Sequence, residues 1–303
     1  MITQNTPTMT DSDTPIFSVC LCTFNDAETI EACLDSILPQ LDHRYELVVT
    51  DGGSVDGTLE HVKERSAKSD VPIRIFTQEE PGLGVARQVC VDNARGDYLL
   101  EQVDADMVFA DCFDELVKFY LETVETEGPF QLYTKGLRIT PQELHEELGG
   151  WRPFPHGFQE NELTRRFFGH GYLRLMDVRV AKHLHPEFGF ETAVRRYLYN
   201  YREKLRCGIS LRYAYEHLYT SNLPIWRKLL DTGTILLTYL WGLNKEHYET
   251  FDKRDPLAYE IDKELYEGCE EGTYEDIRLT PPQHVDQACF NATEDKVYSL
   301  TDA

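Results

Sequence analysis

The sequence predicts an α/β protein with a doubly wound, mainly parallel β-sheet, followed by a partly helical C-terminal extension. Two observations predict this fold. Short apolar runs alternate with segments of helical periodicity through the first hundred residues. Most of the apolar runs end in a cluster of Gly, Asn or Asp, residue types that end strands and begin turns. With 41% hydrophobic residues, the chain of 303 residues has ample material for a buried core.

The alternation begins after residues 1–15, a polar and acidic lead that we expect to be disordered. The predicted strands are short and apolar, as is typical of strands buried on both faces, and they cover residues 16–23, 46–50, 73–77 and 97–101. Apolar side chains recur every three or four residues between these strands, which predicts helices over residues 27–41, 58–67 and 82–94. Strands joined by helices in this way pair in parallel.

The remaining chain is divided at residue 222. We expect the α/β domain to cover residues 16–222, including an aromatic loop rich in Pro and Gly at 149–158, and an extension to cover residues 223–303. Apolar residues in 223–243 fall at helical spacing beside Arg227 and Lys228. The segment is too short to span a bilayer, which needs about 20 apolar residues. It is therefore either a helix lying in the membrane interface or a helix packed on the main domain.

The chain is strongly acidic, with 53 Asp and Glu against 30 Lys and Arg and a formal net charge of −23. This charge argues against nonspecific binding to nucleic acid. The acids are spread along the chain, which favours a halophilic cytoplasm, where salt at 1 M shortens the Debye length to about 3 Å. An ordinary acidic protein is the alternative. Since the N-terminus lacks an apolar targeting signal, we expect a cytoplasmic protein.

Polar residues, together with one phenylalanine, lie at the carboxyl ends of three of the predicted strands. They are Thr23, Phe24, Asn25, Asp51, Asp104 and Asp106. Ligands of doubly wound sheets bind beyond this edge. Two carboxylates at positions i and i+2 can face one ligand, and such hard oxygen donors suit Mg²⁺ or Mn²⁺ bound to a diphosphate. A pair of turn acids is the other interpretation.

Four sequence blocks follow one another in this half of the chain: FSVCLCTFN at 17–25, ELVVTDGGSVDGT at 46–58, GLGVARQ at 82–88 and GDYLLEQVDAD at 96–106. In this order and spacing they resemble the inverting glycosyltransferases of family 2, which have the GT-A fold. The resemblance implies that residues 23–25 line a nucleotide pocket, that Asp51 accepts hydrogen bonds from the base or ribose, and that Arg87 reaches the ribose or phosphates. It also implies that Asp104 lies near the ribose and the metal ion, with Asp106 as the direct metal ligand. Purely structural roles for Phe24, Asp51 and Arg87 stay open.

The same resemblance implies a metal-dependent sugar transfer in which a carboxylate base deprotonates the acceptor hydroxyl. The family usually shows a pair of acids before a helix that contains Arg, and this sequence lacks that pair. Glu191 is the nearest candidate for the base, with a structural acid at a helix start as the alternative. Asp177 and Glu203 remain further candidates. His217 is either a late metal contact or a structural histidine.

We therefore expect an enzyme that moves a sugar from a nucleotide-diphosphate donor, with uridine as the expected base, to a polyprenyl-linked glycan. By analogy of class, it would act at the inner face of an archaeal membrane in N-glycosylation of surface proteins. The aromatic loop could stack on acceptor sugar rings. A hexuronic acid is one candidate sugar, because its carboxylate could meet Arg165, Arg166, Arg195 or Arg196. A polyprenyl-phosphate sugar synthase and a catalytically inactive GT-A binding module are the alternatives.

Overall fold

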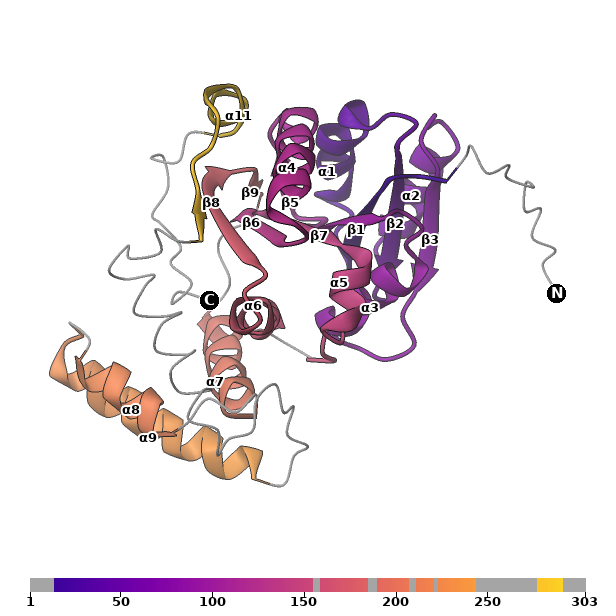
Figure 1. The fold of residues 1–303 in the computed structure, drawn as a ribbon. Helices are drawn as coiled ribbons and strands as arrows, with labels where there is room; N and C mark the ends of the chain where they lie inside the picture. The colour runs from indigo at the N-terminus through magenta and orange to yellow at the C-terminus, as the bar shows by residue number, and fades with distance from the viewer. Residues whose placement is uncertain are drawn as a thin grey trace.

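The computed structural model describes residues 14–154, 159–184, 190–206, 211–220, 223–243 and 277–290. Its centre is an eight-stranded sheet with the order β10-β8-β6-β7-β4-β1-β2-β3 (Figure 1). Strand β7 runs antiparallel to both of its neighbours, and the other pairs in this sheet are parallel. The predicted mainly parallel α/β sheet is confirmed.

The predicted alternation in the first hundred residues is also observed. The strands are β1 (Phe17–Thr23), β2 (Tyr45–Asp51), β3 (Ile73–Thr77) and β4 (Tyr98–Asp104). The helices are α1 (Ile30–Ile37), α2 (Thr58–Ser66) and α3 (Leu83–Asn93). The helix predicted over 27–41 is shorter than expected and ends in a 3₁₀ turn, η1 (Leu38–Gln40), because Pro39 has no N–H to donate within an α-helix.

The second half of the domain widens the sheet. Its elements are β5 (Met107–Phe109), α4 (Phe113–Glu127), β6 (Gln131–Lys135), β7 (Leu137–Pro141), α5 (Gln142–Glu147), α6 (Gln159–Gly169), β8 (Leu173–Arg179) and β9 (Ala181–His183). Strands β5 and β9 form a separate antiparallel ribbon in which Met107 pairs with His183. This ribbon matters for the site, because it starts directly after the two acids at the end of β4.

Helices cover both faces of the sheet, as a doubly wound fold requires. One core cluster joins β1, β2 and β4 to α1, α2 and α4, and a second cluster on the other face joins the same strands to α3, α5 and α6. Within β1, Val19 and Leu21 belong to the first cluster, whereas Cys20 and Cys22 belong to the second. Both faces of the central strands are therefore buried, which explains their apolar sequence.

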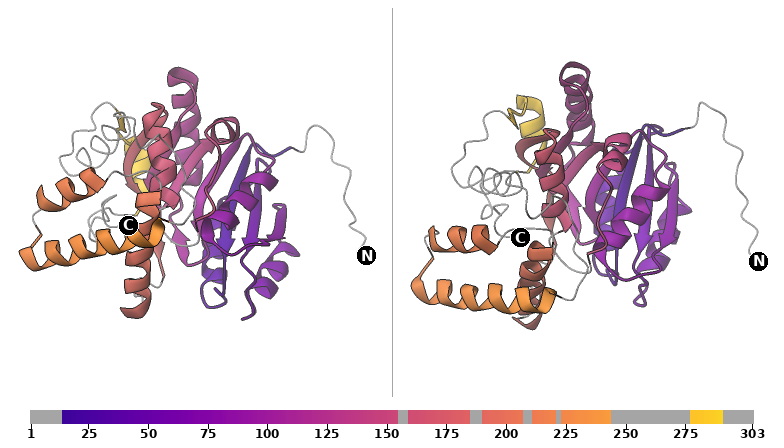
Figure 2. Two further views of the ribbon diagram at one scale, coloured as in Figure 1. Left: turned by 90° about the horizontal axis from the view of Figure 1, so that it is seen from below. Right: turned by 60° about the horizontal axis from the view of Figure 1, so that its bottom comes forward.

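The C-terminal part begins with three helices, α7 (Phe190–Arg206), α8 (Leu211–Thr220) and α9 (Ile225–Gly242). Helix α9 packs against α7 and α8, and the orange pair α8 and α9 lies on the side away from β2 and β3 (Figure 2). After them, β10 (Arg278–Leu279) pairs with β8, and α11 (Gln283–Ala288) packs against α4. In the described residues, no helix has both the length and the hydropathy of a membrane span. The domain boundary at residue 222 stays a prediction.

Candidate active site

The ends of β1 and β2 form one side of the candidate site. Thr23 pairs with Asp51 in the parallel ladder, so the two predicted clusters are adjacent. The Asp51 carboxylate accepts hydrogen bonds from the N–H groups of Gly53 and Ser54, both at 3.0 Å, and from Ser54 Oγ at 2.5 Å. Asp51 is buried and ties down the loop that follows β2. A base or ribose that donated to Asp51 would share its oxygens with this loop.

Phe24 has the exposure that a base-stacking residue needs. Its side chain is 60% exposed, and its ring lies over Gly52, where an added Cβ would meet Phe24 Cδ2 at 3.0 Å. Asn25 takes a different role, because its left-handed backbone (φ 57°) and its contacts bind it to the loop after β2. The N–H of Asn25 donates to Ser54 Oγ at 2.8 Å, and its Oδ1 accepts from the N–H of Val55 at 3.0 Å. Asn25 therefore shapes the edge on which Phe24 is presented.

A β-bulge in β4 decides where Asp104 faces. Leu100 pairs with Val19 and Val103 pairs with Leu21, so that Glu101 and Gln102 together oppose a single residue of β1. Gln102 has a left-handed backbone (φ 66°), and its Oε1 accepts from Arg138 Nε at 3.2 Å. After the bulge, Val103 lies in the first core cluster and Asp104 pairs with Cys22, whose side chain lies on the α3 face. The bulge thus places Asp104 on the face from which Arg87 approaches.

Arg87, on α3, joins Asp104 to an acid from a distant helix. Its Nη2 lies 3.1 Å from Asp104 Oδ2, and its Nη1 lies 2.7 Å from Glu160 Oε1 on α6. The guanidinium is buried and stacks over the Trp151 ring at 4.9 Å. Burial alone would raise the pKa of Glu160, but Arg87 and Arg138 hold it below its ordinary value. Arg87 is therefore a buried cation shared by two carboxylates at the end of β4.

The second acid of the pair, Asp106, meets a histidine brought by the β5–β9 ribbon. His183 Nδ1 lies 3.2 Å from Asp106 Oδ2, and the N–H of Leu184 donates to the Asp106 carbonyl at 2.7 Å. The hydrogen bond to Asp106 raises the pKa of His183 despite its partial burial. Ala105, between the two acids, is buried in the first core cluster.

The acids at this edge favour a bound cation. Burial raises the pKa of Asp104, and Glu160 and Asp106 raise it further against the opposing effect of Arg87. Among the described residues, no group of three or more His, Cys, Asp and Glu forms a ready-made metal cluster. Magnesium usually takes one or two carboxylates and completes its shell with water and substrate phosphates. Asp104 and Asp106 fit a cation that binds together with a diphosphate, while His183 Nδ1 is engaged by Asp106.

Sequence reasoning missed Glu160, His183 and Arg138. Arg138 is fully buried and donates to the Glu160 carbonyl at 3.1 Å, so it supports the acid that Arg87 binds. The partners in these contacts are far apart in the sequence, so no motif of fixed spacing predicts them.

The candidate bases lie in different surroundings. Glu191 is in the first turn of α7 and His217 is in α8, but both side chains lie outside the described part of the structure. Asp177 is exposed and pairs with Lys135 on β6 at 2.5 Å. Glu203 is fully buried, and its carboxylate binds Arg202 and Arg206. Those two arginines occupy both oxygens of Glu203, and the choice of Glu191 as the base stays a prediction.

Two further expectations concern the predicted sugar contacts. Arg166 is buried and donates to Glu162 and to the carbonyl groups of Leu148 and Gly150, so it stabilises the protein interior instead of facing a donor carboxylate. Arg165 is also buried. The side chains of residues 195 and 196 lie outside the described part of the structure. In the aromatic loop, Trp151 and Phe154 are buried, while residues 155–158 are not described.

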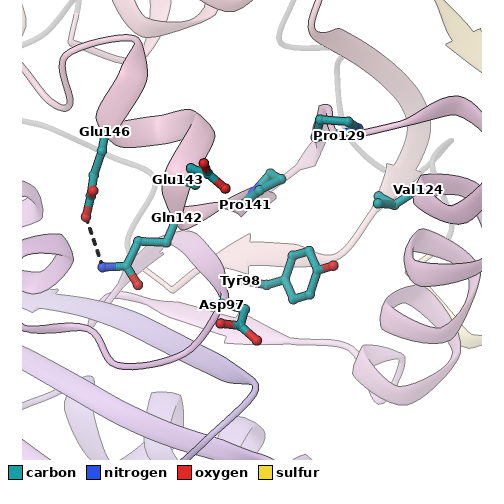
Figure 3. A pocket seen from close by; sticks show the side chains of 8 residues that line it. All are labelled: Asp97, Tyr98, Val124, Pro129, Pro141, Gln142, Glu143 and Glu146. Atoms are coloured by element: carbon teal, nitrogen blue, oxygen red, sulfur yellow. Dashed lines mark hydrogen bonds between the residues drawn. The ribbon is translucent and has the colours of Figure 1, made fainter.

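A separate depression lies at the opposite edge of the sheet. Its lining includes Asp97 and Tyr98 at the start of β4 and Gln142 and Glu146 on α5 (Figure 3). Gln142 Nε2 donates to Glu146 Oε1 at 3.2 Å across its rim. Because it lies at the amino end of β4, this depression is remote from the carboxyl edge where Asp104 and Asp106 lie.

The fold and the acid-lined carboxyl edge define an α/β protein of the class that binds nucleotides beyond its parallel strands. Residues 18–185 match the model of "Glycosyl transferase family 2", and the chain belongs to this family. It is 36% identical over 83 residues to a cholesterol galactosyltransferase of Borreliella burgdorferi, and 37% identical over 86 residues to a PGL/p-HBAD biosynthesis glycosyltransferase of Mycobacterium bovis. These matches cover 27% and 28% of this chain, and only 23% and 34% of the two relatives.

Two solved structures share the fold over most of their length. A mannosyltransferase from Pyrobaculum calidifontis, in complex with GDP-Man and Mn²⁺, has a TM-score of 0.52 at 17% identity and is covered over 88%, against 84% of this chain. A glucosyl-3-phosphoglycerate synthase from Mycobacterium tuberculosis, in complex with Mn²⁺, UDP and glucosyl-3-phosphoglycerate, has a TM-score of 0.51 at 21% identity. It is covered over 88%, against 69% of this chain. At this identity, both comparisons support the fold alone.

Proposed function

We propose that this protein is an inverting, metal-dependent glycosyltransferase that uses a nucleotide-diphosphate sugar. One observation carries the proposal: Asp104 ends β4 beside Arg87, and Asp106 follows two residues later beside His183, on the same sheet edge as the exposed ring of Phe24. Family membership and the solved complexes of proteins with this fold add support. In the bound complex, Phe24 would stack on the base, and Asp51 would accept from the base or ribose.

The proposed metal ion is Mg²⁺ or Mn²⁺, which Asp104 and Asp106 would hold together with water and the donor diphosphate. When bound, such an ion neutralises the charge of the departing diphosphate. Arg87 stays paired with Glu160 and adds a second positive charge near the phosphates. Glu191 is the proposed base, which takes the proton from the acceptor hydroxyl as that oxygen attacks the anomeric carbon from the opposite face.

For the donor we propose a uridine nucleotide, and a hexuronic acid as one candidate sugar. Because Arg166 is bound inside the protein and Arg165 is buried, we retain Arg195 and Arg196 on α7 as the candidate partners for a sugar carboxylate. A neutral hexose would need neither of them. UDP-glucuronate and UDP-glucose, which differ only in this group, distinguish the two possibilities.

For the acceptor we propose a glycan on a polyprenyl lipid at the inner face of the cell membrane, in the assembly of glycans for surface proteins. The exposed apolar residues of α9 support contact with a membrane. The net charge of −23 supports a salt-rich, archaeal cytoplasm, and thermal stability that rises from low to molar KCl would test that origin. Transfer to a bare polyprenyl phosphate would instead favour the synthase alternative.

Ligand binding tests the proposed chemistry. We expect Mn²⁺ with UDP, UDP-glucose or UDP-glucuronate to raise the melting temperature in molar KCl, because ligands that bind only the folded state stabilise it by mass action. Asp106→Asn should abolish the Mn²⁺-dependent part of this rise and the release of UDP during transfer. Asp97→Asn, at the other end of β4, is the matched control and should change neither. A wild-type protein that binds the donor but never transfers sugar would favour the inactive binding module.

A further inference from the structure

Helix α9 is amphipathic in the reverse sense to an ordinary surface helix. Its polar residues Asp231, Thr234 and Thr238 are buried, whereas most of its large apolar side chains are exposed. A helix at the surface of a soluble protein normally turns its apolar face to the core. The polar face of α9 is instead turned toward α7, against which this helix packs.

Specific contacts fix this orientation at both ends of the helix. Near the start, Asp231 accepts hydrogen bonds from Tyr197 of α7 and from Arg227 Nε at 3.1 Å, so that its buried charge is compensated. Near the end, the Arg202 guanidinium of α7 stacks over the Trp241 ring at 4.4 Å. Rotating α9 to bury its apolar face would separate Asp231 from Tyr197 and Trp241 from Arg202.

The outward face is the main apolar surface of the described chain. Of fifteen large hydrophobic residues that are exposed in the described residues, ten lie in 223–243. They are Leu223, Ile225, Trp226, Leu229, Leu230, Leu236, Leu237, Leu240, Trp241 and Leu243. Exposures reach 78% for Ile225 and 65% for Trp226. A patch of this kind marks an interaction surface, and tryptophan is enriched where proteins meet the membrane interface.

Charge indicates which partner this surface fits. Helices α7, α8 and α9 together contain eight Lys and Arg against four Asp and Glu, in a chain with a net charge of −23. This local excess of positive charge in the three helices complements the anionic headgroups of a bilayer. A symmetric dimer through α9 would place two copies of these positively charged helices against each other. It would also bring together two molecules of net charge −23, so repulsion between like charges opposes this dimer.

We propose that α9 lies in the plane of an anionic lipid bilayer, with the side that contains Leu229 and Leu237 inserted and α7 holding it from behind. The helix is too short and too polar to span the bilayer, so it acts as an interfacial anchor. Helices α8 and α9 lie at the side of the molecule, where they can reach a flat surface (Figure 2). The inference deepens the proposed function, because it names the surface that brings the site to a lipid-linked acceptor.

Vesicle flotation of the full chain tests the anchor without any sugar transfer. We expect wild-type protein to float with vesicles of phosphatidylcholine and phosphatidylglycerol, and to bind pure phosphatidylcholine at least tenfold more weakly, at the lowest KCl concentration at which circular dichroism shows a folded protein. The variant Leu229→Ser/Leu237→Ser should lose at least tenfold in binding. The control Ile16→Ser/Val55→Ser, which removes two exposed apolar residues far from α9 in the sequence, should bind like the wild type.

Circular dichroism and melting temperature would show that both double variants fold. The proposal is overturned if the wild type does not float on anionic vesicles, if the α9 variant floats equally well, or if α9 mediates a dimer that the variant dissociates. Asp106→Asn should float normally, so a failure of the proposed chemistry leaves this result intact. Conversely, a variant that fails to float but still transfers sugar to a detergent-solubilised acceptor would support the anchor and the chemistry separately.

Discussion

Replacing Arg87 with Met should destabilise the protein by about 3 kcal/mol. Removing one partner from a buried ion pair costs about 3–5 kcal/mol, because the remaining charge is left without compensation. Here two carboxylates are left, at 3.1 and 2.7 Å from the lost guanidinium. The lower end of the range applies, since the side chains of Asp104 and Glu160 are 19% and 28% exposed and water partly screens them. Met keeps the apolar contact with Trp151, which limits the loss from packing.

Urea unfolding in constant KCl measures this effect. Glu160→Gln in the Arg87→Met background should recover at least about 1 kcal/mol, because it removes one of the two facing carboxylates, so the two changes should not be additive. Arg174→Met is the control: it breaks a pair with the partly exposed Glu127 at 3.0 Å and should cost about 1 kcal/mol or less. If the changes in the free energy of unfolding caused by Arg87→Met and Glu160→Gln simply add, Arg87 does not compensate the charges of Asp104 and Glu160.

Three further predictions concern the same half of the molecule. Burial raises the pKa of Glu101, but His145 holds this pKa below its ordinary value of 4.5. The ionised Glu101 therefore stabilises the folded protein above pH 4.5, and this contribution is lost as the pH falls through the native pKa. In urea titrations, Glu101→Gln should reduce this loss of stability at acid pH. Phe24→Ala should weaken UDP binding by about 1–3 kcal/mol in calorimetry and leave the melting temperature nearly unchanged. Gly84→Ala should lower stability by about 1–3 kcal/mol in thermal unfolding, because its Cβ would lie 2.1 Å from the Arg152 carbonyl oxygen.

Each of these has a direct control or a contradicting result. Glu143→Gln, at an exposed position on α5, should leave the acid limb of the stability curve unchanged. Unaltered UDP affinity in Phe24→Ala would show that the ring does not stack on the base. A Gly84→Ala protein as stable as the wild type would show that the loop at 152–154 adjusts without cost.

The order of strands and helices could be predicted because it depends on local patterns. The runs that form β1 and β2 are buried along their whole length, and the positions of Asp51 and Asp104 follow directly from where the strands end. The meeting of Asp106 with His183 could not be predicted in this way, because a two-stranded ribbon joins residues 77 positions apart. Sequence periodicity also showed that α9 has two faces, but only the partners of Asp231 on α7 show which face is turned inward.

The bulge in β4 gives the strand one residue more than its neighbour requires. If Gln102 were absent, Glu101 would oppose Cys20, and Val103 and Asp104 would keep their present partners Leu21 and Cys22. The pairing of β4 with β1 on both sides of the bulge is therefore compatible with deletion of Gln102. In the shortened strand, Asp104 would still face α3. The deletion would remove the Oε1 of Gln102, which accepts a hydrogen bond from the guanidinium of Arg138. Gln102 therefore contributes to the buried contacts beside the site and not to the pairing of the sheet.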